Sequence, residues 1–166
     1  MAAKTSALAR EIRQNKPFAS PRHEAALGLL KTTDLVHQLQ SRVFEPFGIT
    51  DQQYNVLRIL RGAGAAGLPT LEIADRMIER APGITRLIDR LEKKKLVSRK
   101  RCTTDRRQVF CLLAPAGARL LARMDGPVAG MDLLSMLEDD DIETLIHLLD
   151  AVRAGLSATT PSRRKA

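Results

Sequence analysis

The stretch "PGITRLIDRLEKKKLVSRKRCTTDRRQVFCLL", residues 82–113, changes its hydrophobic period halfway along. Up to Lys95 the apolar residues recur at the spacing of one helical face, and beyond it "LVSRKRC" and "QVFCLL" are β-type runs on either side of the turn formers "TTDRR". The helical stripe consists of Ile84, Leu87, Ile88 and Leu91. The stretch therefore predicts a helix over 82–95 followed by a β-hairpin with a basic tip.

Two further helices are predicted immediately upstream. In "GITDQQYNVLRIL", Thr50 stands three residues before Gln53, which is the spacing of a capping box, and the helix runs to about Arg61. In "LPTLEIADRMI", Thr70 is predicted to cap a short third helix. The inward face of that helix is predicted to hold Leu71, Ala74 and Ile78. Because only "ERA" separates it from the helix in whose first turn Pro82 stands, the pair is a helix-turn-helix candidate.

Long helices are predicted on both sides of this segment. Apolar residues recur at helical spacing over 24–45, and Pro46-Phe47-Gly48 ends that helix. Downstream, a helical pattern covers 116–155, interrupted or bent near Gly126-Pro127, and its last part begins at "EDDDIE", where carboxylates suit a helix N-terminus. The weakly patterned residues 1–22 and 156–166 are expected to form a flexible arm and tail.

The net charge of +8 is concentrated in one segment. Residues 76–107 contain twelve Lys or Arg and four Asp or Glu, a surplus of eight, so the rest of the chain, with 15 basic and 15 acidic residues, is neutral in sum. A contiguous basic patch indicates a polyanionic partner. Proteins that bind single-stranded nucleic acid stack its bases on aromatic side chains. Because aromatic residues make up only 3% of this chain, we expect a double-stranded nucleic acid as the partner.

Membrane, disulfide and metal classes find little support. The apolar runs are far too short to span a membrane, and the N-terminal residues lack a secretory signal, so a cytoplasmic protein without membrane contact is expected. Cys102 and Cys111 form no CxxC pair, which fits a reducing compartment. His23, His37 and His147 are scattered, so neither a metal site nor a cofactor is expected.

Enzymatic motifs are also weak. "GAGAAG", residues 62–67, matches the dinucleotide pattern GxGxxG, which needs a buried strand before it and a helix starting at its glycines. Here Arg58 and Arg61 interrupt the preceding run and Pro69 follows at once, so a flexible glycine loop is the preferred interpretation. The acidic "EDDD" is explained as a helix start, and no nucleophile-base set is evident, so an enzyme is not expected.

Residues 82–113 resemble the recognition helix and wing of MarR-family transcriptional regulators, on the long match "TRLIDRLEKKKLVSR" followed by "DRR". The resemblance implies a mainly α (α+β) fold, with a MarR-like domain over 23–155. That domain holds a winged helix-turn-helix DNA-binding head with a two-stranded wing at about 50–113, flanked by dimerisation helices at about 24–45 and 116–155. The family usually has glycine in place of Lys95, where a left-handed residue commonly closes a helix.

The resemblance also implies a function: a homodimeric, sequence-specific regulator of double-stranded DNA, most simply a repressor that a small phenolic or lipophilic effector releases. The helix over 82–95 would enter the major groove, and the pair Asp105 and Arg107 would reach the minor groove from the wing. Within that helix, Gly83, Thr85 and Arg86 would lie nearest base edges, while Arg90 and the lysines after it would meet phosphate. The expected DNA-contacting residues are Thr70, Pro82, Gly83, Thr85, Arg86, Arg90, Lys94, Arg99, Asp105, Arg106 and Arg107.

Several alternatives stay open on the sequence. The basic patch also suits an architectural duplex binder without strong sequence preference, although the uncharged helix start "PGIT" favours close approach to bases. The apolar terminal helices could complete a monomer core instead of a dimer. His37 could line an effector pocket, and Cys102, beside Lys100 and Arg101, is either an oxidisable thiol or a passive small residue.

Overall fold

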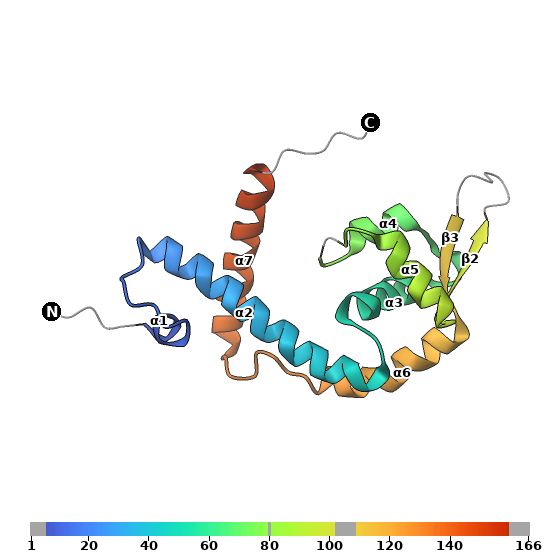
Figure 1. Ribbon diagram of the computed structural model, residues 1–166, viewed down its shortest axis with the longest axis horizontal. Coiled ribbons are helices and arrows are strands. Elements are labelled where there is room, and N and C mark those ends of the chain that lie inside the picture. The colour runs from blue at the N-terminus through green and yellow to red at the C-terminus, as the bar shows by residue number, and fades with distance from the viewer. Residues whose placement is uncertain (1–5, 80, 102–108, 160–166) are drawn as a thin grey trace. The chain divides into compact units, whose positions relative to one another are not determined.

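The computed structural model describes residues 6–79, 81–101 and 109–159 and is mainly helical, with one small antiparallel sheet (Figure 1). The chain forms two compact units divided after Met131, and each is described by itself. The first unit contains α1 (Ala7–Glu11), α2 (Pro21–Phe44), η1 (Glu45–Phe47), α3 (Asp51–Ala63), η2 (Gly64–Ala66), β1 (Leu68–Pro69), α4 (Thr70–Arg76), α5 (Ile84–Lys93), β2 (Val97–Arg101), β3 (Val109–Leu113) and α6 (Pro115–Ala129). The second contains α7 (Asp139–Thr159).

Helix α3 supplies much of the core of the first unit. The predicted capping box is confirmed, because the Thr50 hydroxyl accepts a hydrogen bond from the Gln53 amide while the Gln53 side chain accepts one from the Thr50 amide. The predicted stripe of α5 is confirmed as well. Side chains with no exposed surface at all come from α3, α4, α5, β3 and α6: Val56, Leu57, Leu60, Ile73, Ile88, Leu91, Cys111, Leu121 and Met124.

Helix α4 differs from the sequence prediction in its cap and in its buried face. Thr70 is the first helical residue rather than the cap, and Pro69 occupies the cap position. The helix ends at Arg76, so its inward side is defined by Ile73, which is fully buried. The prediction that Leu71 and Ile78 point inward is wrong, since they are 77% and 88% exposed. A seven-residue helix is too short for periodicity alone to fix its buried side.

The sheet has the order β1-β3-β2, with both pairings antiparallel. The predicted hairpin is confirmed for β2 and β3, which pair from Val97 opposite Leu113 to Arg101 opposite Val109. The third strand, β1, was not predicted: it is two residues long, and its Pro69 is tolerated because the strand lies at the sheet edge. The wing therefore rests on a three-stranded rather than a two-stranded sheet.

The turn from α5 into β2 contains a left-handed residue at Lys95, a conformation that the sequence left open. Lys95 has φ +58°, and its amide donates to the Glu92 carbonyl while the Leu96 amide donates to the Leu91 carbonyl. This hydrogen-bond pair closes the helix as a glycine-type cap does, at a cost of roughly 1 kcal/mol relative to Gly. Helix α5 itself begins at Ile84, after Gly83 at φ +95°, so Pro82 precedes the helix and does not stand in its first turn.

The flanking helices correspond to the predicted ones, with shifted ends. Helix α2 starts at Pro21 behind the cap Ser20, and the short α1 lies within the segment expected to be a flexible arm. Helix α6 continues through Pro127 to Ala129 without interruption. Helix α7 begins at the acidic cluster, as predicted, and continues to Thr159, into the expected tail.

Candidate DNA-binding interface

Helix α5 separates its apolar and charged residues onto two sides. The apolar stripe lies in the core, whereas Thr85, Arg86 and Arg90 are exposed, together with Pro82 and Gly83 just before the helix. Arg86 and Arg90 are one helical turn apart and share a face. Neither arginine has a hydrogen-bond or ion-pair partner among the residues that the structure describes. Their charges are therefore available for an external anion.

Arg99 on β2 is held by helix α5 instead of facing outward. Its guanidinium donates to Asp89 Oδ1 at 2.5 Å and to Glu92 Oε2 at 2.6 Å. Burial lowers the pKa of Arg99, but the hydrogen bond to Asp89 and the charges of Glu92 and Asp89 outweigh it and raise that pKa above its ordinary value. Arg99 therefore fixes β2 against α5, and the DNA contact that the sequence predicted for it stays a prediction.

Two other predicted DNA contacts also bind within the protein. Lys94 Nζ donates to the carbonyl of Gly48 at 2.5 Å, which ties the end of α5 to the turn before α3. Thr70 is half-buried, and its hydroxyl lies 3.7 Å from the buried Cys111 Sγ. Thr70 thus packs against β3, and Lys94, although exposed, is bonded to the turn before α3; the DNA contacts predicted for these two residues stay predictions.

Strand β2 brings further cations toward the wing. Lys100 and Arg101 are exposed at the end of the strand that leads to the hairpin tip. The tip itself, with Cys102 and the predicted contacts Asp105, Arg106 and Arg107, lies outside the described residues. In the described part, the basic surface thus runs from α5 along β2.

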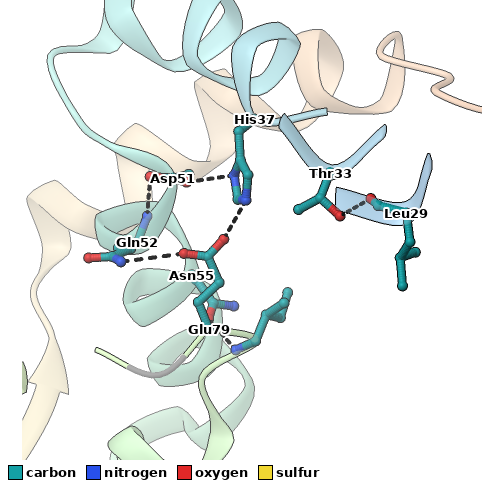
Figure 2. Close-up of polar contacts among 8 residues, drawn as sticks. Leu29, Thr33, His37, Asp51, Gln52, Asn55 and Glu79 are labelled. Atoms are coloured by element: carbon teal, nitrogen blue, oxygen red, sulfur yellow. Dashed lines mark hydrogen bonds and ion pairs between the residues drawn. The ribbon is translucent and has the colours of Figure 1, made fainter. Parts of the chain in front are cut away.

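The first unit also brings together three side chains that the sequence did not connect. His37 of α2 has Nδ1 3.3 Å from Asp51 Oδ2 and Nε2 2.8 Å from Glu79 Oε1, as Figure 2 shows. Their side chains are 37%, 30% and 38% exposed. Metal-binding motifs in a sequence are recognised by short spacings between ligands. These three residues lie on separate elements, far apart in the sequence, so no such motif marks them. His37 therefore faces two carboxylates, an environment that the sequence could not show.

Comparison with known proteins identifies the family. A family model described as MarR family matches residues 49–109. The crystal structure of a MarR transcription factor from Planctomyces limnophilus is 40% identical and has a TM-score of 0.62, covering 81% of this chain and 99% of that one. The HTH-type transcriptional regulator MhqR of Bacillus subtilis is 30% identical over 113 residues, 67% of this chain and 75% of the relative. The chain belongs to the MarR family.

This MarR-family chain is accordingly a transcription regulator with a winged-helix DNA-binding fold, and not an enzyme. The structure of the transcriptional repressor CouR bound to a 23-mer DNA duplex is also similar, with 27% identity, a TM-score of 0.68, and coverage of 77% of this chain and 91% of that one. In the described residues, no helix is long and apolar enough to cross a membrane.

The glycine loop of the MarR-family chain has a structural explanation. "GAGAAG" begins in the last turn of α3 and continues through η2, so a helix and not a strand precedes it, and the context of a dinucleotide motif is missing. Gly67 has φ +64°, and a Cβ there would lie 2.5 Å from the Cys111 carbonyl oxygen. The glycine allows the turn to pass close against β3.

Proposed function

We propose that this MarR-family regulator is a homodimeric, sequence-specific repressor that binds a pseudo-palindromic operator through α5. The observation that carries the proposal is the outward face of α5, where Arg86 and Arg90 have no described partner while Arg99 and Lys94 hold the helix in place. A helix that is held in place, presents free guanidinium groups and starts with the uncharged residues 82–85 suits the major groove. Arg86 reads a base edge, and Arg90 contacts phosphate.

The wing completes the proposed contact. Strand β2 carries the exposed Lys100 and Arg101 toward the tip, and the sequence places Arg107 there with Asp105 two residues before it. In the proposal, the carboxylate extends Arg107 toward a narrow, A·T-rich minor groove, where the negative potential is strongest. Because CouR is a repressor with a solved DNA complex, its similarity to this chain supports DNA binding and repression.

Homodimer formation is proposed from the flanking helices. Helix α7 has no buried residue, and its Ile146 and Leu148 are 52% and 60% exposed. Helix α2, within its own unit, exposes Leu30 and Leu39. Apolar surface of this kind on two long helices favours a second copy of the chain as its cover. The two heads of such a dimer would contact half-sites about one helical turn, ~34 Å, apart.

Selection of bound sites from random duplex by the full chain tests the proposal. We expect inverted half-sites and an affinity for the selected duplex about 1,000-fold or more above that for a scrambled one. Equal affinity for both would show an architectural binder and overturn sequence-specific regulation. Light scattering at micromolar concentration should give the mass of a dimer. The mass of a monomer would reject the proposed homodimer.

The proposal also includes a small phenolic or lipophilic effector that releases the repressor from its operator, and this is tested on the operator complex. Small phenols and lipophilic carboxylic acids, titrated into the operator complex, should release the protein from DNA at concentrations that leave its thermal unfolding unimpaired. Failure of both classes to change operator affinity would reject a phenolic or lipophilic effector.

A further inference from the structure

His37, Asp51 and Glu79 meet from three different elements of the first unit. His37 lies in α2, Asp51 is the first residue of α3, and Glu79 lies in the connection between α4 and α5 (Figure 2). One imidazole nitrogen and one oxygen of each carboxylate all lie within 4.8 Å of one another. Small side-chain movements therefore bring a nitrogen and two carboxylates around one point.

The donor set matches a divalent transition-metal ion. Asp51 and Glu79 bring two negative charges together, and a cation between the two carboxylates relieves their repulsion. Zinc binds His nitrogen and carboxylate oxygen at about 2.0–2.2 Å, so neighbouring ligand atoms stand roughly 3 Å apart. The 2.8 Å between His37 Nε2 and Glu79 Oε1 is near this value. Asp51 Oδ2 lies 3.3 Å from the other ring nitrogen, Nδ1, so the Asp51 side chain must move to share an ion with Nε2. An imidazole in the set favours zinc over magnesium or manganese.

The surroundings support the two carboxylates as ligands. Gln52 donates from its backbone amide to Asp51 Oδ1 at 2.9 Å and from its side chain to Glu79 Oε2 at 3.4 Å. The Ile78 amide donates to Asn55 Oδ1, which fixes the backbone next to Glu79. Such second contacts orient metal ligands. The partial exposure of the three side chains leaves room for water ligands and for entry of the ion.

We infer that His37, Asp51 and Glu79 form a binding site for a divalent transition-metal ion that links α2 to the connection in front of α5. Because α5 is the helix proposed to read DNA, occupation of the site changes the position of that helix and hence operator affinity. This second part rests on the proposed function, whereas metal binding itself does not.

Calorimetry on the full chain, stripped of metal with a chelator, tests the site. Zn²⁺ should bind with one ion per chain, and Mg²⁺ should bind at least tenfold more weakly. His37→Gln and Glu79→Gln should each weaken Zn²⁺ binding tenfold or more, with unchanged circular dichroism, while His23→Gln, a second histidine of α2, should have no effect. Absence of Zn²⁺ binding, or binding that survives both cluster variants, would overturn the inference.

Operator affinity of the stripped and the Zn²⁺-loaded chain tests the coupling. The two forms should differ by about fivefold or more in the unmodified chain, and by less than twofold in His37→Gln. If the chain binds Zn²⁺ but its stripped and loaded forms have equal operator affinity, the coupling is rejected while the metal site itself is retained. A chain that binds Zn²⁺ but no DNA in either form would reject the proposed function instead.

Discussion

Arg86 and Arg99 are both arginines of the basic segment, yet their surroundings give them different roles. Arg99 is 25% exposed in its side chain and bonded to two carboxylates, whereas Arg86 is exposed on α5. A guanidinium that already has two anionic partners gains little from a phosphate, because those contacts must first be broken. Partners within the protein therefore separate the positioning arginine from the one available to DNA.

Arg86→Ala should weaken binding to the operator alone. If the side chain contacts a base edge, the loss is about 1–3 kcal/mol on the operator and close to zero on scrambled duplex. Arg90→Ala, as the comparison, should weaken both duplexes alike because phosphate contacts carry no sequence information. Fluorescence anisotropy on the two duplexes measures this difference. An Arg86 variant that loses affinity equally for both duplexes would contradict base reading.

Arg99→Ala should destabilise the protein and not merely weaken DNA binding. The substitution removes the charge-assisted bonds to Asp89 and Glu92, which contribute about 1–3 kcal/mol. Urea unfolding followed by circular dichroism should show that loss. Arg101→Ala, an exposed arginine of the same strand, should change stability by less than about 0.5 kcal/mol. Equal stabilities of the two variants would mean that the ion pairs do not hold the wing.

Among the elements, the short turn from η2 into β1 depends on one glycine. Gly67→Ala should cost well over 1 kcal/mol, because the new Cβ would lie 2.5 Å from the Cys111 carbonyl oxygen at a φ of +64°. Gly62→Ala is the matched control: it lies inside α3 with open space around it, and should stabilise the protein by about 0.5–1 kcal/mol. Thermal unfolding of both variants shows whether each substitution raises or lowers stability. A Gly67→Ala variant of unchanged stability would contradict the close approach of Gly67 to β3.

The wing is the second element with a separate test. Arg107→Ala should weaken binding to many sequences and lower the salt slope by about one charge per head, because the residue is predicted to add a charge contact in the minor groove. Affinity measured across salt concentration on operator and scrambled duplex checks this. An unchanged slope and affinity would remove the wing tip from the interface.

For the whole molecule, the exposed apolar faces of the long helices predict assembly. Ile146→Asp should shift the chain toward monomer, since it would place an unpaired carboxylate in a buried interface between copies. Glu143→Gln, an exposed residue of the same helix, should leave the dimer unchanged. Light scattering at several concentrations measures the shift. An Ile146 variant as dimeric as the unmodified chain would place the interface elsewhere.

The positive charge of the chain is concentrated in the segment proposed to contact DNA. The surplus of eight positive charges falls in residues 76–107, and in the described part these residues form α5, the connection before it and β2. Some of these cations have partners within the protein: Arg99 pairs with two carboxylates, and Lys94 donates to a backbone carbonyl. A count of basic residues along the sequence therefore overstates the number of cations that are free to meet a partner.

Local sequence patterns determined most of the elements of this protein. The capping box at Thr50 and the buried stripe of α5 follow from contacts within a few residues, and each is present in the structure. The sequence left the conformation of Lys95 open, and the structure has it left-handed. The family itself was evident from one long motif. These features are predictable because backbone hydrogen bonds and helix periodicity join near neighbours in the chain.

Tertiary structure alone decided which polar side chains meet. The inward face of the short α4, the third strand β1, the partners of Arg99 and Lys94 and the meeting of His37 with Asp51 and Glu79 all depend on how distant elements pack. Side-chain partners across separate elements leave no periodic trace in a single sequence, because each residue type would look the same with another partner. The basic residues could thus be predicted as a group, whereas their division into cations bonded within the protein and free cations required the fold.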